Sequence, residues 1–179
     1  MQLAVNDMAV CNEISPEYLE RVLPGIQAGA LVLDTNLPVE SLEFICRSSC
    51  IPLYADPVSS VKAMKLHGVM KHLRAIKPNA LEAAALTGQT DPELAARALI
   101  DEGVQRVFIS LGTNGMIAAE GSRILRMPSP EANVVNATGA GDAAMSAIVW
   151  ADLHGLSLED SARAAQLAGA ITCASEESN

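Results

Sequence analysis

The sequence lacks the features that mark membrane and secreted proteins. No apolar run approaches the roughly 20 residues that a membrane-spanning helix needs. The N-terminus shows no basic stretch followed by an apolar core and a cleavage site, as a secretory signal peptide would. No internal repeat, low-complexity tract or linker interrupts the chain. We therefore expect a soluble, cytoplasmic protein with no membrane partner.

Basic residues are scarce as well. The chain has 12 lysines and arginines against 21 aspartates and glutamates, and its formal net charge is −9. Proteins that bind nucleic acid concentrate lysine and arginine on one face, and the basic residues here do not cluster in that way. Nucleic acid is therefore not an expected partner.

Cysteine and histidine are few and scattered. Four cysteines in a cytosolic chain of this size are typical of buried thiols rather than disulfides. Cys46 and Cys50 are four residues apart, which on a helix is one face, yet neither has a CxxC or nearby histidine partner. We expect no metal cage from these side chains, which are Cys11, Cys46, Cys50, Cys173, His67, His72 and His154.

Apolar residues, by contrast, make up 50% of the 179 residues, enough for one compact domain over residues 1–179. Three short apolar runs end in polar or turn residues, as buried parallel strands do, and helical patterns lie between them. This alternation predicts an α/β fold with a mainly parallel sheet. Two further short strands, separated by Gly121-Ser122, predict a hairpin. The five predicted strand regions are 30–34, 51–57, 104–110, 115–120 and 123–128.

Capping residues predict where several helices begin and end. Ser15 and Asp91 each precede proline and glutamate, an N-cap followed by proline at the first helical position. Pro38 opens another helix, and Gly103 ends the one after Asp91.

Two helices complete the chain. The first follows Asp142 and stops at Gly155. The second starts at Ser157, with Asp160 three residues later forming a capping box.

The stretch NATGAGD, residues 136–142, runs directly into the first of these two helices. Glycines let a ligand approach the main chain, and the first turn of a helix offers unpaired N–H groups that bind anions. A carboxylate is repelled by a bound phosphate unless it has a task such as accepting a proton. The combination suits phosphoryl transfer, in which amides stabilise the moving group and a carboxylate takes the proton of the attacking hydroxyl. The alternative is that Asp142 simply caps the helix.

Three stretches together resemble the PfkB, or ribokinase-like, family of sugar and nucleoside kinases. NATGAGDAAMSA is similar to the family's C-terminal DTxGAGD signature, and KPNALEA and ISLGTNG precede it in the family's order and approximate spacing. The likeness covers essentially the whole chain. It implies a ribokinase-like three-layer α/β/α fold and a kinase that uses ATP and Mg²⁺. A dinucleotide-binding dehydrogenase would need a GxGxxG turn that this sequence lacks.

Within the family, four stretches are most similar to the kinases that phosphorylate the 5′-hydroxyl of pseudouridine. These stretches are NDM, ADPVSSVK, IKPNALEAAALTG and NATGAGDAAM. Ribose or another sugar is the second expectation for the acceptor. A noncatalytic fragment that binds nucleotide or oligomerises is the alternative from a different functional class.

The resemblance assigns roles to particular residues of the glycine turn and of the nucleotide loop. Asp142 is the catalytic base, and the backbone of Gly139, Ala140 and Gly141 forms the anion hole. The ATP-binding loop comprises Ser110, Gly112, Thr113 and Gly115, which match [ST]xGxxG. The alternative for this loop is an ordinary glycine turn after a strand.

Other positions carry a family role and a structural alternative. Asn79 and Glu82 match the NxxE motif, which helps to position Mg²⁺ and phosphates through water, but the same spacing is a capping box. Gln166 falls where the family places an adenine-pocket side chain, and it is equally compatible with a polar surface position. Asp34 and Asp56 end two predicted strands, where structural capping is the simpler interpretation.

The sequence departs from the family pattern at two places. Asn136 replaces the acid that starts the usual signature, and Ala137 replaces a hydroxyl or branched residue, so K⁺ activation is less expected here. The strands, lid and GG motif that precede this region in the family are not visible. We therefore expect an exposed sheet edge, association of copies through it, and weak binding of the sugar.

Overall fold

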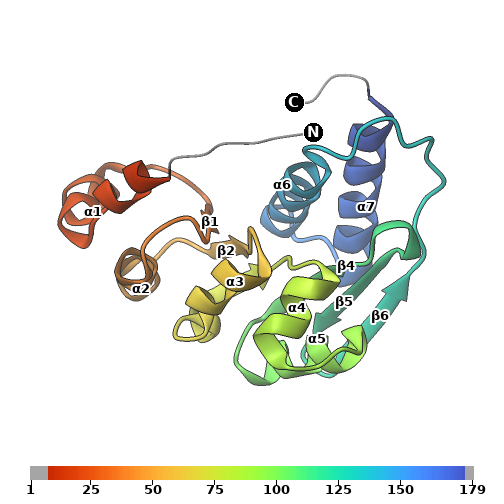
Figure 1. The fold of residues 1–179 in the computed structure, drawn as a ribbon, viewed down its shortest axis with the longest axis horizontal. Coiled ribbons are helices and arrows are strands. Elements are labelled where there is room, and N and C mark those ends of the chain that lie inside the picture. Colours follow the sequence, from red (N-terminus) through yellow and green to blue (C-terminus); the bar gives the residue numbers. More distant parts are fainter. Residues whose placement is uncertain (1–7, 176–179) are drawn as a thin grey trace.

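The computed structural model describes residues 8–175. A six-stranded sheet with the order β1-β2-β3-β4-β5-β6 forms its centre (Figure 1). β1 to β4 are parallel, and β5 and β6 are antiparallel to their neighbours. The mainly parallel sheet and the hairpin are thus confirmed. The strands are β1 (Leu31–Asp34), β2 (Leu53–Asp56), β3 (Leu73–Ile76), β4 (Arg106–Ser110), β5 (Met116–Glu120) and β6 (Arg123–Met127).

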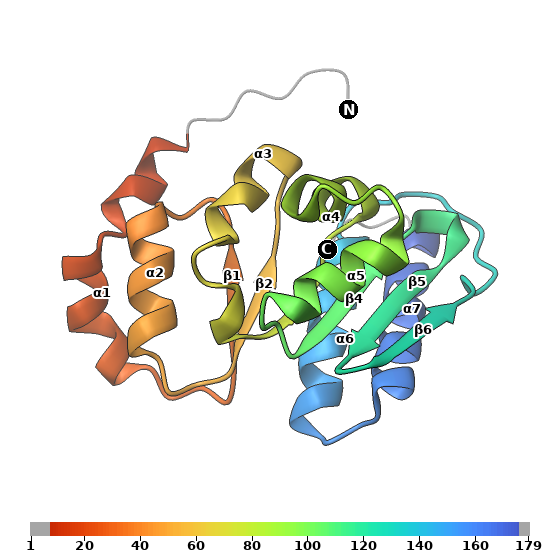
Figure 2. The ribbon, with the colours of Figure 1, turned by 90° about the horizontal axis from the view of Figure 1, so that it is seen from below.

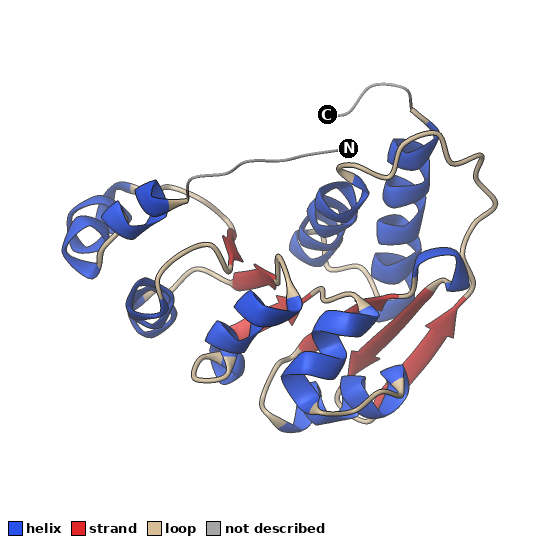
Figure 3. Cartoon of the chain, viewed as in Figure 1, coloured by secondary structure: helices blue, strands red, loops and turns tan. Residues whose placement is uncertain are grey.

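Helices cover both faces of the sheet, so the molecule has the expected three layers (Figures 2 and 3). Helices α1 to α5 lie on one side and α6 and α7 on the other. Their bounds are α1 (Pro16–Val22), α2 (Val39–Ser48), α3 (Ser60–Ala63), α4 (Ala80–Thr87), α5 (Pro92–Asp101), α6 (Ala140–Leu153) and α7 (Leu158–Ala174). Short 3-10 turns are η1 (Ala9–Glu13), η2 (Leu23–Gly25), η3 (Met64–Leu66), η4 (Met70–His72) and η5 (Gly112–Asn114).

The two faces of the sheet bury separate apolar clusters because successive strand residues point to opposite sides. Leu53 and Ala55 of β2 pack in the cluster under α2 to α5, while Tyr54 between them packs in the cluster under α6 and α7. Phe108 of β4 likewise faces α6 and α7. Burial on both sides explains why these strands appear as continuous apolar runs in the sequence.

Strand β3 was not among the predicted strands. It is only four residues long, and Arg74 interrupts its apolar pattern. The guanidinium of Arg74 forms two hydrogen bonds of 2.7 and 2.6 Å with the carboxylate of Asp152 on α6. An arginine on a buried strand is therefore neutralised by a partner 78 positions away, which local sequence patterns do not reveal.

The predicted helix starts are mostly confirmed. The hydroxyl of Ser15 accepts a hydrogen bond from Tyr18 N, and Asp91 accepts one from Glu93 N. The prediction of a capping box at Ser157 is wrong in one detail. Ser157 accepts from Asp160 N, but the Asp160 carboxylate accepts a 2.7 Å bond from the Ser157 hydroxyl instead of from its backbone N–H.

All four cysteines are free thiols, but they do not share one environment. Cys46 is buried in α2, and burial raises the pKa of its thiol to about 11. Cys50 lies beyond the end of α2 and is exposed. The expectation of buried thiols therefore holds for Cys46 and is wrong for Cys50, which also lies off the helix, while Cys11 and Cys173 are only partly buried.

β1 forms one edge of the described sheet, and its residue Val32 is 51% exposed. The expected exposed edge is thus present in residues 8–175. Over the same residues, no helix is both long and apolar enough to cross a bilayer. Asn6 and Asp7 of the NDM stretch lie outside the described part of the chain.

Candidate functional site

The parallel strands bring polar residues to a common edge of the sheet. Asp34 and Asp56 end β1 and β2 and are register partners, and Lys77 directly follows β3. Asn79 then pairs with Ser110 at the end of β4. Because ligands of α/β proteins bind at the carboxyl ends of parallel strands, this edge is where a site is expected.

A cavity of about 350 Å³ opens at this edge. Its walls come from the loop after β4, the segment that follows β6, and helices α6 and α7. Small and apolar residues line most of it, as in many small-molecule sites. Seven predicted site residues lie on its wall, namely Ser110, Gly112, Thr113, Gly115, Ala140, Gly141 and Gln166.

Gly115 is required by close packing in the loop after β4. Its φ is +93°, and a Cβ at this position would lie 1.9 Å from the carbonyl oxygen of Met127. The carbonyl of Gly115 also accepts a 2.8 Å hydrogen bond from Leu111 N, which closes the loop. The loop therefore packs against the end of β6 through bare backbone, and no other residue type fits there.

The glycine turn starts α6 earlier than predicted. The N-cap is Gly139, with φ +81°, and the helix begins at Ala140. Gly139 O accepts the hydrogen bond from Ala143 N at 2.9 Å. Asp142 is therefore inside the first turn and makes no capping bond, so the helix-cap interpretation of Asp142 is wrong. Ala140 N donates a 3.4 Å hydrogen bond to Ala137 O, so the N–H groups of Gly141 and Asp142 are the first-turn amides that remain available to an anion.

Asp142 is exposed and faces a second cavity, of about 420 Å³. Three carboxylates and a few apolar side chains line it, namely Val32, Asp34, Leu37, Asp56, Asp142, Met145 and Ser146. Gly141 lines the first cavity and Asp142 the second, although they are adjacent in the chain. The start of α6 thus stands between the two cavities.

Lys77 is a site residue that the sequence reasoning missed. It is only 5% exposed, lines the first cavity, and forms a 3.0 Å ion pair with Asp56 of the second. Burial raises the pKa of Asp56, the nearby carboxylates of Asp142 and Asp34 act in the same direction, and Lys77 opposes them. A lysine directly after an apolar strand was the available signal, but β3 itself was not recognised.

Asn79 and Glu82 form the capping box of α4. Asn79 Oδ1 accepts from Glu82 N, and Glu82 Oε2 accepts from Asn79 N, each at 2.9 Å. Burial raises the pKa of Glu82, while the backbone bond to Asn79 lowers it. Neither residue lines a cavity wall. Within residues 8–175, no group of three His, Cys, Asp or Glu side chains is arranged to hold a metal ion.

Gln166 connects α7 to the end of β6. Its Nε2 donates a 3.2 Å hydrogen bond to Met127 O. The residue is half-buried and lines the first cavity, so it does not occupy an open polar surface. Asn136, where the family signature has an acid, accepts a 3.0 Å bond from Thr138 N and stabilises the turn before Gly139.

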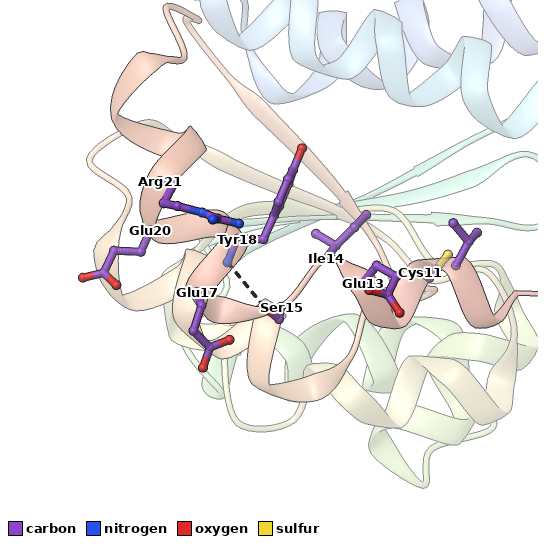
Figure 4. Close-up of a pocket in the computed structure, with 9 residues that line it drawn as sticks. Cys11, Glu13, Ile14, Ser15, Glu17, Tyr18, Glu20 and Arg21 are labelled. Carbon is purple, nitrogen blue, oxygen red and sulfur yellow. Dashed lines mark hydrogen bonds between the residues drawn. The ribbon is translucent and has the colours of Figure 1, made fainter.

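A larger hollow, of about 800 Å³, lies far from these residues, on η1 and α1 (Figure 4). It is shallow and acidic, with Glu13, Glu17 and Glu20 beside Tyr18 and Arg21. In the close-up, the Ser15 hydroxyl accepts its hydrogen bond from Tyr18 N, which is a helix cap. None of the site residues predicted from the sequence lines this hollow, so its size does not identify a site.

A sequence profile described as pfkB family carbohydrate kinase matches residues 25–179. The chain belongs to the PfkB family. Escherichia coli pseudouridine kinase is 33% identical to this PfkB protein over 100% of the chain and 60% of the kinase. An uncharacterized sugar kinase of E. coli, YeiI, is also 33% identical, over 99% of the chain and 51% of the relative.

The solved structures agree on the fold of this PfkB protein. A carbohydrate kinase from Agrobacterium tumefaciens is 28% identical and superposes with a TM-score of 0.83, covering 99% of the chain and 59% of that kinase. The Thermotoga maritima ribokinase has a TM-score of 0.81 at 22% identity, which supports the ribokinase-like three-layer fold. The chain spans between 51% and 60% of the length of the relatives described here.

Proposed function

We propose that this PfkB protein carries the nucleotide-binding and proton-accepting half of an ATP-dependent kinase. The placement of Gly141 and Asp142 on two adjoining cavities carries the proposal. A phosphoryl donor in the first cavity would meet the amides at the start of α6. A hydroxyl in the second would meet the exposed carboxylate of Asp142. Phosphoryl transfer requires donor, acceptor and base to be held together in this way.

The first cavity is proposed to hold ATP. Small residues of α7, together with Gln166, would enclose the adenine, and the loop from Ser110 to Gly115 would lie along the phosphates. The backbone of Gly139, Ala140 and Gly141 would stabilise charge on the transferring group. Donors of this kind contribute about 3 to 4 kcal/mol to transition-state stabilisation. Asp142 would accept the hydroxyl proton as general base.

Asn79 and Glu82 are proposed to position Mg²⁺ through water. Asn79 Oδ1 and Glu82 Oε2 already accept hydrogen bonds from backbone N–H groups, so the pair suits an outer shell better than direct coordination. Mg²⁺ retains several waters and is held largely by substrate phosphates, which fits such a site. The ion would neutralise charge on the phosphates when bound. A monovalent cation beside the glycine turn is less supported, because Asn136 is uncharged and caps the turn.

The proposed acceptor is the 5′-hydroxyl of pseudouridine, with ribose or another sugar second. The 33% identity to E. coli pseudouridine kinase over the whole chain supports the first choice. A ribokinase from Lactococcus lactis, 27% identical over 90% of the chain, supports the second. The second cavity lies beside the exposed Val32 of β1, so an acceptor would be covered on one side only.

That open side favours a second candidate, a fragment that binds ATP but transfers no phosphoryl group. One experiment separates the two. The purified chain is incubated with Mg·ATP and a panel of nucleosides and sugars, and thermal unfolding is followed in parallel. Stabilisation by Mg·ATP with transfer to pseudouridine supports the kinase, and stabilisation without transfer supports the fragment. If Mg·ATP at millimolar concentration left the unfolding temperature unchanged, both candidates would be wrong.

A further inference from the structure

Lys77 places a buried positive charge at the boundary between the two cavities. It is 5% exposed and lines the first cavity. Its Nζ lies 3.0 Å from Asp56 Oδ2 on the wall of the second cavity. The same Nζ is 3.5 Å from the position that a Cβ on Gly141 would take. The ammonium therefore lies beside the backbone turn to which the proposed phosphoryl group binds.

The surroundings of Lys77 are strongly acidic. Three carboxylates line the second cavity, those of Asp34, Asp56 and Asp142. The buried Glu82 also interacts electrostatically with Asp56 and Lys77. A nucleotide phosphate that approached Gly141 would be repelled by these carboxylates. The helix amides alone carry a charge of about half a unit, which falls off within one turn. A full positive charge at Gly141 would offset that repulsion.

A purely structural role explains the pair less well. Replacing a buried ion pair by apolar side chains of similar volume is often neutral or stabilising, and here Lys77 is buried while Asp56 is partly exposed. This pair also lies at the cavity walls, Lys77 on the first cavity and Asp56 on the second.

We propose that Lys77 binds the terminal phosphoryl group of the nucleotide and follows it during transfer, while Asp56 positions the ammonium. The inference rests on the proposed kinase function and adds a residue to it. In the step, the acceptor oxygen forms a bond to the γ-phosphorus, and the bond from phosphorus to the bridging oxygen breaks. ADP leaves with the electron pair, and the hydroxyl proton moves to Asp142. In this step Lys77 contributes only its positive charge, which stabilises the charge on the transferring oxygens.

The test compares Mg·AMP-PNP with Mg·ADP, which differ in the terminal phosphoryl group. Their dissociation constants are measured by calorimetry for the unchanged chain and for Lys77→Met. The variant should lose about tenfold or more in affinity for Mg·AMP-PNP, as expected for a hydrogen bond to a charged group, and less than about threefold for Mg·ADP. Equal losses for both nucleotides, or none, would overturn the inference.

Matched variants separate charge from folding. Lys71→Met makes the same change at an exposed lysine before β3 and should leave both affinities unchanged. Lys77→Arg keeps the charge and should retain part of the preference for Mg·AMP-PNP. Since Lys77→Met leaves the partly buried Asp56 without its partner, the double variant with Asp56→Asn removes both charges and is compared if the single variant unfolds. The double variant should show the same selective loss of affinity for Mg·AMP-PNP.

The double variant also tests the positioning role. Asp56→Asn alone should weaken the binding of Mg·AMP-PNP more than that of Mg·ADP. In a chain that already carries Lys77→Met, Asp56→Asn should cause no further loss of affinity. Additive effects would refute the role of Asp56. If the unchanged chain binds neither nucleotide, the proposed function fails and this inference with it. If it binds both nucleotides but Lys77→Met is without selective effect, only this inference fails.

Discussion

At the scale of single residues, Asp142 has an exposed side chain on a backbone that is held in a helix. It lies in the first turn of α6, has no capping task, and faces the acidic cavity. Asp142→Asn keeps the size of the side chain but removes the proton acceptor. We expect phosphoryl transfer to fall by about 10² to 10⁴, the usual contribution of a positioned base, with Mg·ATP binding retained. Rates on the best acceptor of the panel and calorimetric binding of Mg·ATP test this. Undiminished transfer would remove Asp142 from the base role.

The close packing around Gly115 leads to a prediction about the free energy of unfolding. In Gly115→Ala the added methyl would collide with Met127 O, and the positive φ adds strain, so the loop has to move. We expect a loss of more than about 2 kcal/mol in the free energy of unfolding, together with weaker nucleotide binding. Gly112→Ala is the control, because its φ is +59° but no atom lies within 4 Å of the added methyl. Urea unfolding of both variants measures the difference, and equal losses would contradict the steric explanation.

At the scale of elements, α6 is held at both ends. Its start forms the wall between the cavities, and Asp152 near its end binds the sheet. The carboxylate of Asp152 accepts a 2.6 Å hydrogen bond from the Tyr54 hydroxyl and two bonds from Arg74, and it lies 3.1 Å from Arg106 Nη1. Burial works to raise the pKa of Asp152, but the bonds from Arg74 and Tyr54 prevail and lower it.

Asp152→Asn should therefore destabilise the fold. Removing one partner of a buried ion pair costs about 3 to 5 kcal/mol, because the arginines are left without compensation. The lowered pKa of Asp152 also determines how the stability of the fold changes with pH. The stabilisation is present above the unfolded pKa of about 3.9 and is lost as the pH falls below it.

Chemical unfolding from pH 7 down to pH 3 checks both points. The variant should lose less stability on acidification than the unchanged chain does. Asp101→Asn, at an exposed position on α5, is the control and should behave like the unchanged chain. A full acid dependence in Asp152→Asn would show that other carboxylates dominate.

The elements also show which features the sequence could predict. β1, β2, β4 and the hairpin were recognisable because they are apolar or bounded by turn residues, and capping residues marked most helix starts. β3 was not, since Arg74 depends on Asp152, a residue distant in the sequence. Lys77 directly follows β3 and was missed because β3 itself was not predicted. The loop and turn motifs predicted six residues of one cavity wall, and the family resemblance added Gln166. The pairing of Lys77 with Asp56, by contrast, depends on the register of neighbouring strands.

At the scale of the whole molecule, the sheet ends in an open strand. β1 has no neighbour on one side within the described residues, and Val32 leaves an apolar surface exposed next to the acidic cavity. Open strand edges favour association. We expect the chain to self-associate with rising concentration, and Val32→Lys to reduce this without changing stabilisation by Mg·ATP. Sedimentation over a concentration series tests the expectation. Arg163→Lys, exposed on α7, is the control. Association unaffected by Val32→Lys would place the contact elsewhere.

The neighbouring positions of Gly141 and Asp142 have a mechanical consequence. One peptide bond joins the amide proposed to hold the donor to the carboxylate proposed to receive the proton. No movement of loops or of a neighbouring domain can separate the backbones of these two residues, since both move as one rigid body with α6. Opening or closing around the acceptor would therefore govern whether substrates meet, while the backbone positions that present the amide and the carboxylate stay constant.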